Sequence, residues 1–224
     1  MARGWCLLIL LGLLLGGCAS AQSSLLLEDT NCAPPCWRGI TPGQTSKEEA
    51  LQILTAMDEV KPDSVIVAPL SERYPESISA TFREAKERIV VLYLRQGKVA
   101  ALAFWGESGT AAQAVDFFGL PEVVVAVFGQ AEPPYLVYSY LYPGRGIRFG
   151  YRQDNTACAA QAELRRDAVL GAVIYFDPGE FSALLSEGEL GLGIRKLETL
   201  AARAVPWTGF GWIEAFSPPG VCKP

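Results

Sequence analysis

The chain has 224 residues, with 24 acidic and 19 basic side chains and a formal net charge of −5. An acidic chain without clustered Lys and Arg is a poor nucleic-acid binder, because phosphate contacts need gathered positive charge. Histidine is absent, which removes the usual general base and the usual zinc ligand. We therefore expect no nucleic-acid partner, no cofactor, no bound metal and no enzymatic activity.

A short apolar run, Leu7 to Leu15, follows the positive charge of Arg3. Its length is typical of a signal-peptide core and too short to span a bilayer. The run ends in "LGGCAS", which resembles the lipobox of bacterial lipoproteins, where the signal is cut just before a cysteine that carries lipid. The resemblance implies that residues 1–17 are a signal peptide and that Cys18 is the lipid anchor of an exported protein. An ordinary signal peptide with a chance cysteine is the alternative.

Residues 18–30 are expected to form a tether between this anchor and the folded part. Once the signal is removed and Cys18 is lipidated, four cysteines remain: Cys32, Cys36, Cys158 and Cys222. An even number of cysteines in an exported protein indicates disulfides, with three connectivities open to them. We predict the pairs Cys32–Cys36 and Cys158–Cys222.

The first pair also allows a functional interpretation. Its Cys-x-x-x-Cys spacing resembles the copper- and thiol-handling motif of exported thioredoxin-like proteins. In those proteins the cysteines follow a strand and open a helix, but here Pro34 and Pro35 prevent a helix between them. We favour a structural disulfide, and thiol-redox or metal handling by Cys32 and Cys36 stays as the alternative function.

A first unit is expected over residues 31–107. Ser46 with Glu49 fits a capping box, and apolar residues with helical spacing follow it as far as Val60. Segments rich in β-branched and aromatic residues then predict strands at 77–82, 89–94 and 99–104, with "RQGK" as a hairpin turn.

A second unit is expected over residues 108–179. Thr110 with Gln113 fits a second capping box, and its helix should stop at Gly119. Strands are predicted at 135–142, 147–151 and 169–176. Residues 121–128 are ambiguous, because Pro121 suits a helix start whereas "VVVAVF" suits a strand; we predict a short helix. The remaining residues, 180–224, should form a tail with helices at 180–187 and 192–203, pinned by the second disulfide.

This order of elements, with "GQT" before the first helix and "GLPE" at 119–122, is similar to the β-lactamase-inhibitor-protein-like domains and the small outer-membrane-assembly lipoproteins. "CAPPCWRGITPGQTS" also resembles the start of uncharacterised bacterial lipoproteins. The resemblance implies an α+β fold of two tandem helix-plus-antiparallel-sheet units with a C-terminal helical tail. It further implies a protein that binds other proteins rather than one that catalyses.

Two groups of aromatic residues are candidate binding sites. Trp207, Phe210 and Trp212 lie among glycines, and such rings can form a platform for a sugar or a peptide. Tyr138 and Tyr140 share one side of a predicted strand and suggest a binding face. For both groups the alternative is packing in the core. The sequence thus predicts an exported, lipid-anchored, non-catalytic binding or scaffold protein at the cell envelope, with the membrane and an envelope protein or glycan as partners.

Overall fold

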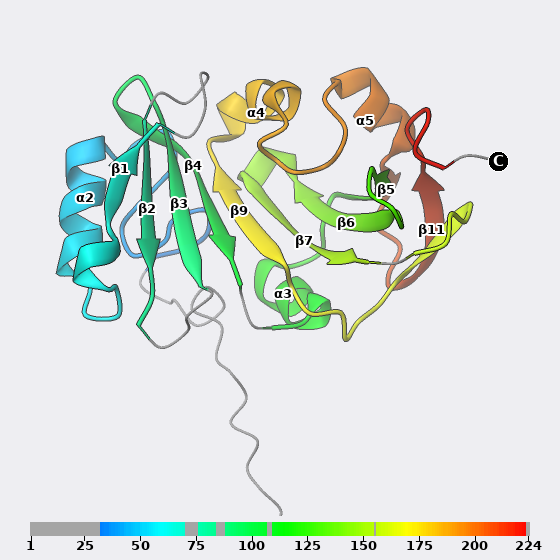
Figure 1. Ribbon diagram of the computed structural model, residues 1–224, viewed down its shortest axis with the longest axis horizontal. Helices are drawn as coiled ribbons and strands as arrows, with labels where there is room; N and C mark the ends of the chain where they lie inside the picture. Colours follow the sequence, from blue (N-terminus) through cyan, green and yellow to red (C-terminus); the bar gives the residue numbers. More distant parts are fainter. Residues whose placement is uncertain (1–31, 70–75, 84–87, 107–108, 155, 223–224) are drawn as a thin grey trace, which may run out of the picture.

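The computed structural model describes residues 32–69, 76–83, 88–106, 109–154 and 156–222. Its main feature is one large sheet in the order β1-β2-β3-β4-β9-β7-β6-β5-β11-β8, with β10 paired to β5 off this path (Figure 1). The strands are β1 Ile66–Ala68, β2 Ser77–Thr81, β3 Ile89–Arg95, β4 Lys98–Trp105, β5 Val123–Gly129, β6 Tyr135–Tyr142, β7 Ile147–Gln153, β8 Gln161–Leu164, β9 Ala172–Phe176, β10 Val205–Pro206 and β11 Gly211–Phe216. The sheet is mixed, because β11 runs parallel to β5 while the other pairs are antiparallel.

The predicted α+β fold of two tandem units is wrong. β4 pairs directly with β9, from Ala101 opposite Phe176 to Trp105 opposite Ala172, so the two halves share a single sheet. Both strands are apolar on both faces and almost wholly buried. Left as edges, they would expose unpaired backbone groups and apolar side chains, and pairing them removes both costs. The fold is therefore mostly β, with a few short helices.

Both predicted capping boxes are present. The Ser46 amide donates to Glu49 Oε2 at 2.8 Å at the start of α2 (Lys47–Ala56), and the Thr110 amide donates to Gln113 Oε1 at 2.8 Å at the start of α3 (Ala111–Phe118). These local signals need no tertiary help, because each satisfies backbone donors within its own turn.

The short helix predicted at residues 121–128 is wrong. Val123 to Gly129 form β5, which pairs along its whole length with β6. The run of β-branched residues decided the outcome, since their side chains pack well on a pleated surface and poorly on a helix. The tail has the two predicted helices, α4 Phe181–Glu187 and α5 Leu197–Arg203, and adds β10 and β11 to the sheet. The described residues also contain three short 3₁₀ turns: η1 Pro62–Ser64, η2 Pro143–Arg145 and η3 Pro178–Glu180.

Each face of the sheet carries its own core. On the first face α2, α3 and Trp37 pack over an aromatic layer that includes Phe118, Tyr140 and Phe149. On the second face α4, α5 and residues 188–194 cover a smaller aliphatic layer. Figure 1 shows α4 and α5 together at the top of the view and α3 at the bottom. The second face is the one that positions the candidate site.

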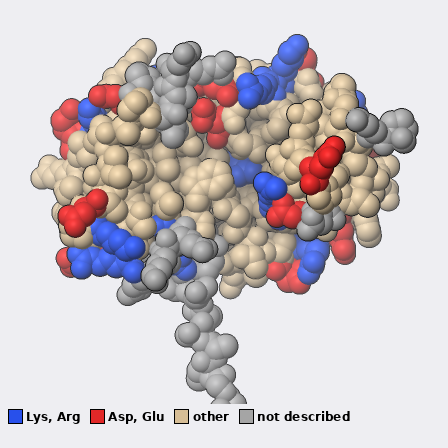
Figure 2. All heavy atoms as spheres, in the orientation of Figure 1, with Lys and Arg blue, Asp and Glu red and all other residues tan. Residues whose placement is uncertain are grey.

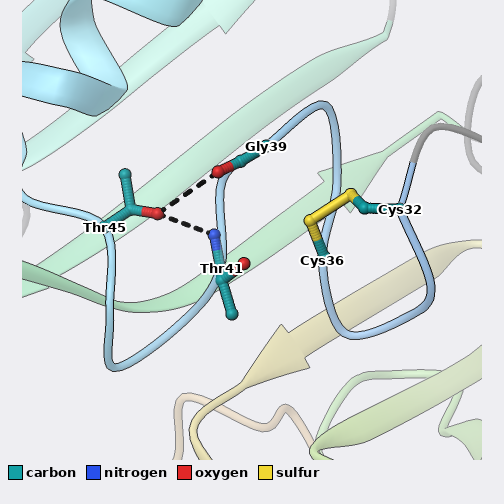
Figure 3. The surroundings of a disulfide bond; sticks show 5 residues. All are labelled: Cys32, Cys36, Gly39, Thr41 and Thr45. Carbon is teal, nitrogen blue, oxygen red and sulfur yellow. Dashed lines mark hydrogen bonds between the residues drawn. A yellow bond between two sulfur atoms is a disulfide. The ribbon is translucent and has the colours of Figure 1, made fainter.

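Both predicted disulfides are present. Cys32–Cys36 closes a small loop (Figure 3), and Cys158–Cys222 joins the tail to the segment before β8 across 64 residues. The first loop leads into Trp37, which is 1% exposed and packs edge-on against Phe104 at 5.0 Å between ring centroids. Thr45 Oγ1 then accepts the Thr41 amide at 2.8 Å and holds the turn before α2. This disulfide therefore lies directly beside a buried core residue, where a structural role is expected.

Candidate functional site

A row of small residues crosses the second face of the sheet. Trp105 of β4 lies opposite Ala172 of β9, Ala172 lies opposite Gly150 of β7, and Gly150 lies opposite Ser139 of β6. Residues opposite one another on neighbouring strands point to the same face. The three small side chains therefore leave a depression beside the large indole of Trp105.

This depression is a cleft of about 410 Å³. Its described lining residues are Trp105, Tyr135, Val137, Arg148, Gly150, Tyr151, Arg152, Gly171, Ala172 and Gly191. Apolar and aromatic groups dominate the lining, and the polar side chains among them are few, as in small-molecule sites generally. Trp105 is 45% exposed, so its ring remains available to a ligand.

Arg148 is the most unusual residue of the cleft. It lies between Ile174 and Leu141 on the second face and is only 4% exposed. Its Nη2 donates to Ser139 Oγ at 3.0 Å, whereas its Nε is buried and makes no hydrogen bond. The guanidinium is thus held in place by one contact, and part of its donor capacity is unused.

Gly150 makes the room for this guanidinium. A Cβ at Gly150 would lie 2.0 Å from the carbonyl oxygen of Tyr138 and 3.2 Å from Arg148 Nη2. Any side chain there would force apart the backbones of β6 and β7 and displace the arginine. The absence of a side chain at this position is what lets Arg148 lie along the sheet and reach Ser139.

Among the described residues, no carboxylate balances the charge of Arg148. The ion pairs found among the described residues involve other side chains throughout, and the nearest in sequence joins Arg152 Nε to Asp154 Oδ1 at 2.6 Å. Burial lowers the pKa of Arg148 to about 10, which still leaves it protonated at neutral pH. A buried cation without a partner is costly to the fold. A cost of this kind is typical of a functional position.

The rim of the cleft is electrically quiet by comparison. Arg152 packs over the ring of Tyr135, with 3.7 Å between its Cζ and the ring centroid, and its charge is paired with Asp154. The ring of Tyr151 faces the other core and stacks on Tyr138. The excess positive charge of the cleft therefore resides on Arg148.

The predicted tyrosines are placed in the core. Tyr138 and Tyr140 are 2% and 0% exposed, and they stack on Tyr151 and Phe149 with centroids 4.4 and 4.6 Å apart. Burial raises the pKa of Tyr138 to about 12 and that of Tyr140 further. Their rings form part of the cross-strand packing on the first face and are not offered to a ligand.

The three predicted tail aromatics are divided between core and surface. Trp207 and Phe210 pack edge-on against each other at 5.0 Å, and both approach the ring of Tyr140. Trp212 is 67% exposed and lies on β11 opposite Glu163 of β8. The structure thus does not bring the three together as one platform.

The predicted lipid-bearing Cys18 and the signal sequence lie outside the described residues. Within the described ranges, no helix is long and apolar enough to cross a membrane, and no group of three or more Cys, Asp or Glu side chains could hold a metal ion. Comparison with protein-family models, curated proteins and solved structures finds no match to this chain.

Sequence reasoning missed Trp105, Ser139, Arg148 and Gly150. The strand at 147–151, "IRFGY", was predicted, and its alternation places Arg148 and Gly150 on one face. An arginine at such a position is usually solvent-exposed. Residues 188–194, far along the chain, contribute to the cover of that face, and Gly191 lines the cleft together with Arg148.

Proposed function

We propose that the protein is an exported, lipid-anchored, non-catalytic binding protein, and that it holds its ligand in the cleft beside Trp105. The observation that carries this proposal is the buried, unbalanced charge of Arg148 on the floor of that cleft. A fold that needed only stability would pair such a charge or replace it with an apolar side chain. A bound ligand of opposite charge would remove the cost.

The chemistry of the cleft supports binding rather than catalysis. Its described lining contains no carboxylate, thiol or primary amine, and burial raises the pKa of Tyr151, one of its two tyrosines. General acid–base catalysis needs a group that titrates near the working pH. The cleft offers positive charge and apolar area, which are the means of recognition.

Export and anchoring are supported by the chain's cysteines. Two disulfides are typical of proteins that fold in an oxidising compartment. The lipobox-like "LGGCAS" supplies the anchor at Cys18. On the face shown in Figure 2, acidic and basic side chains lie in small mixed groups among uncharged ones, which gives a nucleic acid no basic field on that face.

No observation favours the thiol-redox alternative. Cys32 and Cys36 form a disulfide beside a buried tryptophan, and α2 begins well beyond them at Lys47. A low-pKa thiolate needs a helix N-terminus or a nearby cation. The adjacent cation, Arg38, pairs with Glu59 at 3.1 Å.

Native mass spectrometry of the full-length protein, extracted in mild detergent from the cells that make it, tests the proposal. We expect an acylated N-terminal cysteine, oxidised ectodomain cysteines, and an additional bound mass that is released on unfolding. Trp105→Ala should lose that mass, whereas Trp212→Ala, which removes a more exposed tryptophan elsewhere, should keep it. An uncleaved and unmodified N-terminus would refute the anchoring, and a protein that retains no ligand in any form would refute the binding function.

A further inference from the structure

We infer that the ligand is a carboxylate attached to an apolar body, with the carboxylate bound by Arg148 and the body packed against Trp105. This inference rests on the proposed binding function and specifies its ligand class. It combines three independent features of the cleft: its charge, its donor geometry and its lining.

The charge of the cleft selects a monoanion. Arg148 carries one positive charge without a carboxylate partner, and Arg152 at the rim is neutralised by Asp154 at 2.6 Å. A single negative charge therefore completes the site. A phosphate monoester would bring close to two negative charges, and the second would face no free cation among the described lining residues.

The donor geometry favours a carboxylate among monoanions. A guanidinium is a rigid planar fork that binds the two oxygens of a carboxylate with parallel hydrogen bonds. Ser139 Oγ accepts from Nη2 at 3.0 Å, which restrains the fork before a ligand arrives. Arg148 and Gly150 line the cleft together, and Gly150 brings no side chain of its own against the guanidinium.

The lining selects an apolar body. Trp105, Tyr135 and Val137 offer apolar surface, while Gly150, Gly171 and Ala172 form a floor without large side chains. A volume of about 410 Å³ lies near the lower end of small-molecule sites. It suits a small aromatic or branched acid, or the last residue of a peptide with its free C-terminal carboxylate.

Calorimetric titration of the disulfide-intact, full-length protein in detergent tests this inference. The ligands are 4-phenylbutyrate, its neutral amide, phenyl phosphate, and the peptide acetyl-Ala-Ala-Phe with a free or an amidated C-terminus. We expect the free carboxylates to bind on the order of tenfold or more tighter than the matched amides, as the loss of a charged hydrogen bond implies. Phenyl phosphate should bind more weakly than phenylbutyrate. The stronger of the two carboxylates identifies the source as a free acid or a peptide end.

Three variants locate the binding. Arg148→Met should weaken the carboxylate on the order of 10- to 100-fold and should leave the amide unchanged, while Arg148→Lys should retain part of the preference. Trp105→Ala should weaken acid and amide alike. Arg165→Met, which removes an arginine paired with Asp167 at 2.8 Å on the surface, is the matched control and should bind as the wild type does. Thermal midpoints recorded in parallel confirm that each variant is folded.

Equal binding of acids and amides, tighter binding of phosphate, or an unchanged Arg148→Met titration would each overturn the inference. In any of these cases a native ligand lost from Trp105→Ala would leave the binding function standing. Failure of all the ligands to bind, together with a native complex whose bound mass is a neutral compound, would likewise refute only the carboxylate.

Discussion

Arg95 and Arg148 lie in two regions of the same sheet that solve the same problem differently. Arg95, at the end of β3, donates through Nη1 to Glu180 and through Nη2 to Glu187 Oε2 at 2.6 Å. Arg148, the second residue of β7, has among the described residues only the hydroxyl of Ser139 as a hydrogen-bond partner. The first arginine joins α4 to the sheet, whereas the second bonds only to a neighbouring strand of the sheet itself.

The two arginines also differ in depth. The side chain of Arg95 is 25% exposed, whereas Arg148 as a residue is 4% exposed. Arg95, whose charge is the more exposed to water, has two carboxylate partners. Arg148, whose charge is the more buried, has none among the described residues. A structural arginine and a binding arginine are distinguished here by their partners rather than by their positions on the strand.

The largest expected effect comes from a substitution that disturbs the packing around Arg148. Gly150→Ala should lower the free energy of unfolding by about 3 kcal/mol, because the new Cβ overlaps the carbonyl of Tyr138. Gly171→Ala is the matched control, since its Cβ would meet nothing closer than 3.7 Å. Urea denaturation measures both. A Gly150→Ala protein as stable as the control would show that β6 and β7 can move apart around the arginine at little cost.

The second largest effect is expected when Arg95, the structural arginine, is removed. Arg95→Met should cost about 2 kcal/mol, because Glu180 and Glu187 would be left close together and partly buried without a cation. This is below the cost for a fully buried pair, since all three side chains keep some exposure. Arg165→Met, at an exposed pair, should leave the midpoint of urea denaturation where it is. A similar midpoint for both variants would mean that the Arg95 pairs are screened like surface ones.

How much of this comparison the sequence could predict depends on the range of each interaction. The capping boxes at Ser46 and Thr110, the hairpin at "RQGK" and the strand at 135–142 were all predicted, because neighbouring residues determine them. The even number of cysteines predicted disulfides, and the Cys158–Cys222 pair was chosen among three connectivities that the sequence left open. Local patterns of this kind predict most strands of the sheet, but they do not predict that the strands of the two halves join into one sheet.

The rest depends on contacts between distant segments. That β4 pairs with β9 follows from two strands that are apolar on both faces, and such a run does not reveal its neighbour. Within the ambiguous segment, the β-branched run from Val123 favoured a strand, and β6 supplied the partner that such a strand needs. The site was missed for the same reason: Gly191 and its neighbours, distant in sequence, lie over the face that the local alternation of β7 makes outward-facing.

The third effect has the opposite sign from that of Arg95. Arg148→Met should raise the free energy of unfolding by about 1 kcal/mol, because an apolar side chain of similar length replaces a buried unpaired charge. The gain is reduced by the Ser139 hydroxyl, which loses its donor. Urea denaturation is the measurement. Guanidinium chloride is unsuitable as the denaturant, because its chloride counterion can bind the arginine. A loss of about 1 kcal/mol or more would make Arg148 a structural residue and would remove the basis of the proposed site.

The smallest effect separates the charge of Arg148 from its packing by means of pH. Burial raises the pKa of Tyr93 and Tyr138 to about 12 from an ordinary value of 10.0, so the native state holds these protons more tightly than the unfolded state and stability falls as pH rises above 10.

Arg148 acts in the other direction. Its native pKa of about 10 lies below the ordinary 12.5, so over that window the unfolded state binds the additional proton and stability rises with pH. Between pH 8 and pH 11 the wild type should lose about 1 kcal/mol for each such tyrosine and regain about as much as one tyrosine costs from Arg148. Arg148→Met lacks this opposing contribution, so its stability measured in urea should fall more steeply over the same range. Parallel pH profiles for the two proteins would show that Arg148 is solvated in the native state. Arg148 and Arg95 would then differ in the arrangement of their partners and not in the environment of their charges.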